Sequence, residues 1–252
     1  MDPVLIELGP LVIRWYGAMM ALMILLTVVM AYRYGPRFGI PTQELDRLTI
    51  PFILIAVIGA RLGYVLSHPA EFVNLVEVLR IDHGGLTSHG AIAGALLLLW
   101  ATSRRRSLSL WSLADTTAWA VPLGNVFVRF GNLMNGELYG DITRLPWAVT
   151  FPGVPGPRHP LQIYEMFFGG IVLLLALRVA RRRRFDGEVF WKIMVLSSIG
   201  RIFLDLLRSE DRVFSVLTLG HIPALVLLIG GLRFLGVHRG LVQARSPKPE
   251  AR

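Results

Sequence analysis

Long apolar runs alternate with short polar segments along the chain, and this pattern predicts about seven membrane-spanning helices. The runs that we interpret as spans cover residues 15–32, 50–66, 90–102, 110–128, 161–180, 188–207 and 213–235. Several approach the roughly 20 residues that a helix needs to cross the hydrocarbon core of a bilayer. The third run is short and begins among glycines, so we expect an irregular or re-entrant start that other helices shield. The pattern therefore predicts an all-α integral membrane protein.

The composition supports this class. Of the 252 residues, 54% are hydrophobic and only 17% are charged, and the mean hydropathy of +0.56 exceeds what a soluble domain needs for its core. The acidic N-terminus lacks the basic start of a signal peptide, so we expect the first apolar run to be a retained helix. We expect residues 1–240 to form a single polytopic membrane domain and residues 241–252 a disordered cytoplasmic tail.

Orientation in a membrane explains the net charge of +9 better than nucleic-acid binding does, because the basic residues form short runs between apolar spans. These basic residues are Arg33, Arg37, Arg47, the run 104–106, the run 181–184, Arg239, Arg245 and Lys248. With seven spans they all lie on the cytoplasmic side. The N-terminus is then outside and the C-terminus in the cytoplasm.

Cysteine is absent, which excludes disulfides, thiolate metal sites and catalysis by a cysteine of this chain. Any thiol chemistry must use a thiol of the substrate. The sequence also contains no P-loop, dinucleotide fingerprint, metal-ligand set or serine nucleophile elbow. We therefore expect neither a metal nor a cofactor.

Polar residues cluster between Gly124 and Gly140, in the segment GNVFVRFGNLMNGELYG. The cluster contains Arg129, Asn132, Asn135 and Glu137. Ionisable groups at membrane depth are costly to bury, so such a cluster indicates a functional site. The alternative is a polar loop outside the bilayer.

A second polar set lies in the segment GRIFLDLLR, where Arg201, Asp205 and Arg208 are spaced i, i+4 and i+7. This spacing predicts one stripe on a helix that is otherwise apolar. Two arginines against one carboxylate leave positive charge uncompensated, which calls for an anion. A salt-bridged structural stripe is the alternative.

Two further segments carry polar residues. In RHPLQIYE, the three-residue spacing of His159, Gln162 and Glu165 predicts one face of a helix that Pro160 begins. This face either orients arginines or forms a hydrogen-bonded seam between helices, and we favour the seam. In DHGGLTSHG, His89 can exchange a proton near neutral pH, although a structural histidine is also open.

Together these residues predict a polar pocket near the outer leaflet. The planar donors of arginine match phosphate oxygens bidentately, and the abundant phosphate-bearing molecule in a bilayer is a phospholipid. The residue chemistry by itself indicates a membrane protein that grips a phospholipid headgroup and carries out proton-coupled chemistry on it.

The segment RFGNLMNGELYG resembles the signature of the bacterial prolipoprotein diacylglyceryl transferases. Further matches follow in the family's order: IRWYG at Tyr16, GARLGYVL around Arg61, HGGLTSHGAIAG around His89, and then RHPLQIYE and GRIFLDLLR. The resemblance implies a seven-helix enzyme of the bacterial cytoplasmic (inner) membrane. Such an enzyme moves the diacylglyceryl group of phosphatidylglycerol to the lipobox cysteine of a preprolipoprotein, forming a thioether and releasing glycerol phosphate.

The resemblance also suggests roles for individual residues. We expect His89, Arg129 and Arg201 to be catalytic. The substrate-binding residues that we expect are Tyr16, Arg129, Asn132, Asn135, Glu137, Gly140, Asp205 and Arg208. Glu137 and Asp205 are expected to orient the arginines.

Four positions depart from the family pattern: Val128 replaces a glycine, Leu161 a serine, Asp205 a glutamate and His221 a common glutamine. The departures bear on substrate fit more than on the fold. They leave open a divergent paralogue that acts on another phospholipid or acceptor. A non-catalytic carrier of anionic lipids and a headgroup hydrolase are further alternatives.

Overall fold

The computed structural model describes residues 1–9, 11–71, 74, 77–78, 85–208, 212–214, 217–218 and 221–245. The chain divides into two compact units. The first unit comprises residues 1–30 and 117–252, and the second comprises residues 31–116. The prediction of a single domain over residues 1–240 stays a prediction.

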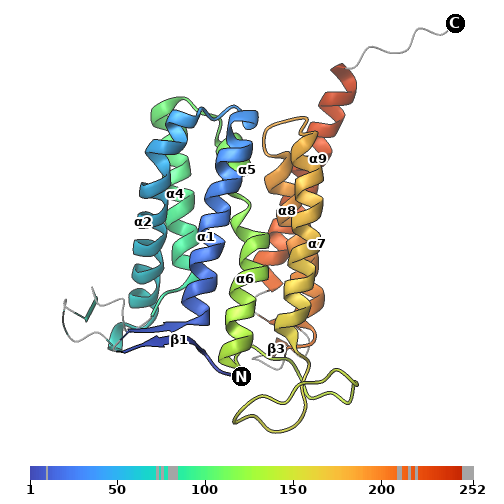
Figure 1. Ribbon diagram of the computed structural model, residues 1–252. Helices are drawn as coiled ribbons and strands as arrows, with labels where there is room; N and C mark the ends of the chain where they lie inside the picture. The colour runs from blue at the N-terminus through green and yellow to red at the C-terminus, as the bar shows by residue number, and fades with distance from the viewer. Residues whose placement is uncertain are drawn as a thin grey trace, which may run out of the picture. The chain divides into compact units, whose positions relative to one another are not determined.

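Helices account for most of both units (Figure 1). The helices are α1 (Trp15–Tyr34), α2 (Thr42–Ser67), α4 (Ser88–Arg106), α5 (Leu110–Thr117), α6 (Ala120–Asn135), α7 (Leu161–Arg181), α8 (Glu188–Asp205) and α9 (His221–Arg245), with short 3₁₀ helices at Gly35–Phe38 and Pro69–Glu71. The strands are β1 (Val4–Leu8), β2 (Leu11–Arg14), β3 (Arg212–Phe214) and β4 (Leu217–Thr218). They form two antiparallel two-stranded sheets, β1–β2 and β3–β4. The fold is therefore mostly helical but not all-α, in contrast to the expectation from the sequence.

Four helical segments of the described chain are long and apolar enough to cross a membrane: Trp15–Phe38, Thr42–Ser67, Leu161–Arg181 and His221–Leu241. The other three predicted spans also fall on helices, but these are shorter or more charged. Helix α8, for example, carries Glu188, Lys192, Arg201 and Asp205 within its 18 residues. The structure therefore supports a helical membrane protein, and the count of seven spans stays a prediction.

Three predicted spans differ in detail from the structure. The third is a continuous helix, α4, which Thr87 caps by accepting a hydrogen bond from the backbone N–H of Gly90. The fourth is divided between α5 and α6. The last begins at His221 and not at residue 213, because strands β3 and β4 precede α9. Helix α9 also continues to Arg245, into the predicted tail, and residues 246–252 lie outside the described chain.

In the second unit, glycines allow α2 and α4 to pack closely. Gly59 and Gly63 on α2 face Gly90 and Gly94 on α4, each pair spaced four residues apart. A Cβ on Gly63 would lie 2.9 Å from the Cα of Gly90, and one on Gly94 would lie 2.7 Å from the carbonyl oxygen of Ile55. Such spacing of small residues is typical of helices that associate in membranes. The glycines that suggested an irregular segment therefore serve helix packing.

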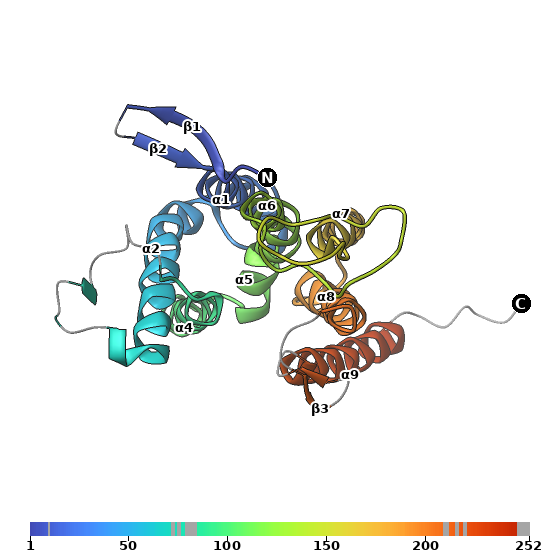
Figure 2. The same ribbon diagram turned by 90° about the horizontal axis from the view of Figure 1, so that it is seen from below.

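In the first unit, α6, α7, α8 and α9 lie side by side in chain order (Figures 1 and 2). Glycine again marks a close approach, since a Cβ on Gly169 of α7 would lie 2.7 Å from the Cβ of Asn125 on α6. Successive helices run in opposite directions, so the end of α6, the start of α7 and the end of α8 meet at one end of this unit.

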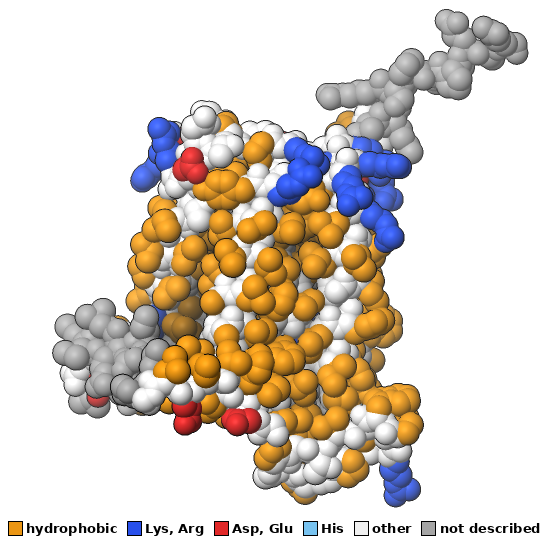
Figure 3. All heavy atoms as spheres, in the orientation of Figure 1, with side chains coloured by type: hydrophobic (Ala, Val, Ile, Leu, Met, Phe, Trp, Pro, Cys, Tyr) orange, Lys and Arg blue, Asp and Glu red, His pale blue; other side chains and the backbone are white. Residues whose placement is uncertain are grey.

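The opposite end of the first unit is basic. Glu188 at the start of α8 is buried, and it pairs with Lys192 at 2.6 Å and with Arg184 at 3.4 Å. Arginines of the run 181–184 surround this end, and Figure 3 shows Lys and Arg side chains gathered where α7 ends. Helix α7 has 21 residues and at 1.5 Å per residue is about 30 Å long. The basic run and the residues at the start of α7 are therefore separated by about the thickness of a bilayer core.

Candidate functional site

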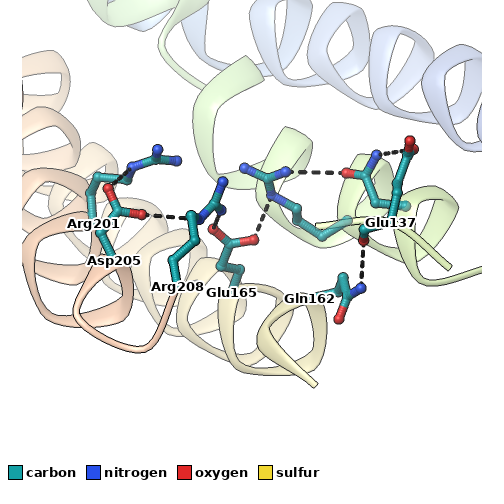
Figure 4. Close-up of polar contacts among 8 residues, drawn as sticks. Glu137, Gln162, Glu165, Arg201, Asp205 and Arg208 are labelled. Atoms are coloured by element: carbon teal, nitrogen blue, oxygen red, sulfur yellow. Dashed lines mark hydrogen bonds and ion pairs between the residues drawn. The ribbon is translucent and has the colours of Figure 1, made fainter. Parts of the chain in front are cut away.

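Three arginines and two carboxylates form a continuous chain of ion pairs in the first unit (Figure 4). Arg129 of α6 contacts Glu165 of α7, with 2.7 Å between Nε and Oε2. The other oxygen of Glu165 lies 3.2 Å from Nη2 of Arg208. Asp205 then contacts Arg208 Nε at 3.4 Å through Oδ1 and Arg201 Nε at 2.6 Å through Oδ2. Positive and negative groups alternate, and Arg129 and Arg201 lie at the two ends.

Burial distinguishes the middle of this chain from its ends. The side chains of Glu165, Asp205 and Arg208 are at most 8% exposed, whereas those of Arg129 and Arg201 are 18% and 35% exposed. Each terminal arginine uses Nε for its carboxylate, which leaves the Nη groups as further donors. Among the described residues, the Nη groups of Arg201 have no hydrogen-bond partner. The two ends of the chain thus present partly exposed guanidinium groups that keep donors beyond their ion pairs.

The end of α6 supports Arg129 from a second side. Nη1 of Arg129 donates to Oδ1 of Asn132 at 3.2 Å. The amide nitrogens of Asn132 and Asn135 both donate to the same oxygen of Glu137, at 2.8 and 3.1 Å. Glu137 therefore acts on Arg129 through Asn132 and makes no ion pair with an arginine among the described residues.

The turn after α6 has an unusual backbone. Gly136 ends the helix with φ of 72°, and Leu138 also has a positive φ, 62°, which a bulky residue rarely adopts. The fully buried side chain of Gln162 donates to the carbonyl oxygen of Glu137 from α7. The contact ties the strained turn to the helix that carries Glu165.

Gly140 lies where three segments of backbone meet. Its N–H donates to the carbonyl oxygen of His159 at 2.9 Å. A Cβ at this position would lie 2.7 Å from the carbonyl oxygen of Leu207 and 2.8 Å from the Cβ of His159. The structure gives Gly140 a packing role, and a binding role stays a prediction.

Two of the predicted helix faces include a residue that lies outside its helix: Arg208 follows α8, and His159 precedes α7. Helix α8 ends at Asp205, and the N–H of Arg208 donates to the carbonyl oxygen of Asp205 in the turn that follows. Arg208 nevertheless contacts Asp205, because the turn directs it back toward the helix. His159 likewise precedes α7, which begins at Leu161, and its Nδ1 lies 3.2 Å from the hydroxyl of Tyr164.

The contacts of Glu165 agree with the less favoured of the two interpretations of its helix face. The sequence favoured a seam between helices over an arginine-orienting face, and in the structure the carboxylate bridges Arg129 and Arg208. The signal was present in the sequence, because a carboxylate near the start of an apolar helix needs a partner. What the sequence does not give is which arginine lies beside it.

Tyr16 and His89 have different positions. Tyr16 is the second residue of α1, lies in the first unit and packs against Gly131 of α6. The charges of Arg129 and Glu137 both act on its hydroxyl. His89 lies on the first turn of α4 in the second unit, where it is exposed. Its part in proton transfer stays a prediction. No group of three or more His, Asp or Glu side chains in the described part of the chain could hold a metal ion.

Comparison with known proteins assigns the family. The match to the family described as prolipoprotein diacylglyceryl transferase extends over residues 3–237. The chain belongs to the prolipoprotein diacylglyceryl transferase family. This match includes every residue of the ion-pair chain and confirms the resemblance seen in the sequence motifs.

Similar proteins of this family come from several bacteria, and three of them bear the name phosphatidylglycerol–prolipoprotein diacylglyceryl transferase. One from Nitratidesulfovibrio vulgaris (strain DP4) is 35% identical over 249 residues, which cover 93% of each chain. One from Thermus thermophilus is 38% identical over 227 residues, covering 80% of this chain and 81% of the relative. One from Bacillus cereus (strain 03BB102) is 34% identical over 257 residues, covering 97% and 94%.

Proposed function

We propose that the protein transfers the diacylglyceryl group of phosphatidylglycerol to the lipobox cysteine of preprolipoproteins. The products are a thioether-linked diacylglyceryl cysteine and glycerol phosphate. The observation that carries the proposal, within this family, is the pair of arginines at the ends of the ion-pair chain. Arg129 and Arg201 are held through Nε and keep Nη donors for a phosphate.

In the proposed reaction, the cysteine thiolate attacks the glycerol carbon that carries the phosphate ester. The C–S bond forms as the C–O bond to phosphate breaks, and the electron pair leaves with the phosphate oxygen. Negative charge therefore grows on the leaving group. Guanidinium groups that are already held beside that oxygen stabilise the transition state. Such electrostatic stabilisation is usually the largest contribution to catalysis.

The thiol must lose its proton to react. The chain has no cysteine, so the nucleophile belongs to the precursor. A free thiol has a pKa near 8.5 and needs only modest help from a base or from positive surroundings. His89 is the proposed base on chemical grounds. Tyr16, Asn132, Asn135 and Gly140 are proposed to contact the headgroup or to shape its site.

The proposed location is the bacterial cytoplasmic membrane, with seven spans and the site near the outer leaflet. Support comes from the first unit, where the ion-pair chain and the basic run 181–184 lie at opposite ends of α7. If the basic run is cytoplasmic, the arginine chain faces outward, where translocated precursors arrive.

The alternatives predict different products. Purified protein should be incubated with labelled phosphatidylglycerol and a lipobox peptide, beside a peptide whose cysteine is replaced by serine. The transferase gives a thioether-linked lipopeptide only with cysteine. Free diacylglycerol would indicate a hydrolase, binding without turnover would indicate a carrier, and turnover only with another phospholipid or acceptor would indicate a divergent paralogue.

A further inference from the structure

Glu165 joins the two halves of the arginine site. Its carboxylate is 7% exposed, and each oxygen contacts a different arginine: Oε2 lies 2.7 Å from Nε of Arg129 and Oε1 lies 3.2 Å from Nη2 of Arg208. No other carboxylate in the described part of the chain forms an ion pair with Arg129. The position of the Arg129 guanidinium therefore depends on α7 as well as on its own helix.

Arg208 continues the connection toward the other end of the site. Its guanidinium lies between two acidic groups, because Nη2 faces Glu165 and Nε faces Asp205, and its side chain is only 8% exposed. Asp205 in turn contacts Nε of Arg201. The charge of Arg208 is thus compensated inside the protein. At the ends of the chain, the Nη groups of Arg201 have no hydrogen-bond partner among the described residues (Figure 4), and Arg129 uses Nη1 for Asn132 and keeps Nη2 as a further donor.

We propose that Glu165 is a positioning residue for the transfer reaction, and that Glu165, Arg208 and Asp205 together set the spacing between the Arg129 and Arg201 guanidinium groups. Glu165 does not touch the substrate. It fixes Arg129 through Nε, so that the Nη edge stays aligned with the leaving phosphate. The inference rests on the proposed function and assigns Arg208 an internal role in place of the substrate contact expected from the sequence.

The physical reason is the sensitivity of catalysis to placement. Two guanidinium groups can share one phosphate only if their separation matches its oxygens, and a misplacement of about 1 Å can cost about 100-fold in rate. Bare arginines would also repel each other, since the charges of Arg201 and Arg208 both act on Arg129. Alternating carboxylates allow three like charges to remain close together.

The test uses two substitutions of Glu165. Glu165→Gln keeps the shape and one acceptor oxygen but removes the charge. Glu165→Asp keeps the charge but is shorter by one methylene, so it cannot hold both arginines at their present distances. We expect both to lower kcat about tenfold or more, while KM for phosphatidylglycerol changes less. Removing one partner of a buried ion pair also destabilises a protein, so rates are normalised to folded protein. If the glutamine variant fails to fold, the aspartate variant, which retains the charge, still tests the proposal.

Glu188 supplies a matched control. It is also a buried carboxylate that pairs with two basic side chains, Lys192 and Arg184, but at the far end of α8. Glu188→Gln should reduce thermal stability and leave kcat per folded protein near that of the parent. An equal loss of kcat in Glu165→Gln and Glu188→Gln would mean that Glu165 forms only a structural ion pair and does not position Arg129.

A double-mutant cycle with Arg129 distinguishes positioning from folding. If Glu165 acts through Arg129, Glu165→Gln should cause little further loss in the Arg129→Lys background, because the group that it places is already altered. Losses that multiply fully would overturn the inference, as would a parental kcat in Glu165→Asp. A parent that forms no thioether product would instead contradict the proposed function itself.

Discussion

Tyr16 and Gly131 bring α1 and α6 into backbone contact beside the arginine site. A Cβ on Gly131 would lie 2.8 Å from the Cα of Tyr16 and 3.1 Å from its ring. Gly131 stands between Arg129 and Asn132 in the chain, so the same turn of α6 carries the guanidinium, its amide partner and the surface on which Tyr16 packs. The close approach at this glycine thus brings Tyr16 to the turn of α6 that carries Arg129 and Asn132.

Replacement of this glycine is expected to affect the site. Gly131→Ala should push α1 away from α6 and lower turnover about tenfold or more, since a small displacement of catalytic groups is costly. The control is Gly124→Ala in the same helix, where a Cβ has no neighbour within 4 Å. That change should preserve turnover and raise stability by up to about 1 kcal/mol. The measurements are thioether formation per folded protein and the thermal midpoint, and indistinguishable variants would contradict this packing argument.

Arg129 tests the phosphate clamp. Arg129→Lys keeps the charge but loses the planar set of donors, so it cannot contact Glu165, Asn132 and a phosphate at once. We expect most of the activity to disappear while the protein still inserts into membranes. Arg104→Lys, in the basic last turn of α4, should leave turnover nearly unchanged. Turnover by the Arg129 variant at the parental rate would exclude a bidentate clamp, and equal losses at both positions would point to folding.

Much of this arrangement follows from the sequence, because apolar run length and charge placement act locally. The helices around Tyr16, Arg129 and Arg201 were predicted on that basis, and so was the contact between Arg201 and Asp205, which are one helical turn apart. The sequence predicted a shared pocket, but not which side chains of distant segments contact each other. Glu165 and Arg129 are 36 positions apart, and their pairing depends on how α6 and α7 pack.

Local sequence patterns gave wrong predictions at two places, where contacts outside the local segment decided the conformation. The glycines Gly90 and Gly94 resemble helix breakers when read along the chain, yet in the structure they allow α4 to approach α2. Arg208 fits the periodicity of α8, but the helix has ended by that point and the following turn supplies the contact to Asp205. Tertiary packing decided both cases.

The proposed orientation is tested by access from the two sides of the membrane. A reporter fused after Arg252 should be cytoplasmic, and a tag inserted between Pro152 and Pro157 should be reached by reagents that do not cross the membrane. Both follow from an odd number of spans with the basic run 181–184 inside. The two positions are separated by α7, α8 and α9, so labelling of both from the same side would mean that one of these three helices does not cross the membrane and that the count of seven is wrong. Helix α8 would then be the helix in question, because α7 and α9 supply two of the four segments that are long and apolar enough to cross.

The proposed role of His89 rests on the ability of its imidazole to exchange a proton near neutral pH. His89 is exposed on α4 in the second unit, and the proposal that it accepts the thiol proton predicts a specific dependence on pH. His89→Asn preserves some hydrogen bonding but cannot exchange a proton near neutrality, so turnover at neutral pH should fall strongly. As the pH rises toward about 8.5, the substrate thiol ionises unaided, and the rate of the variant relative to the parent should recover in part.

A structural histidine predicts a different result, and the pH profile separates the two. Its replacement would lower yield or thermal stability but leave a profile parallel to that of the parent. His68→Asn serves as the control, because His68 is also exposed in the second unit, where it follows α2. Turnover of the three proteins is measured against pH in the same liposomes, with folded protein quantified separately. Parallel profiles for parent and His89→Asn would remove the proton-transfer role, and the positive field of Arg129 and Arg201 would then have to ionise the thiol without a base.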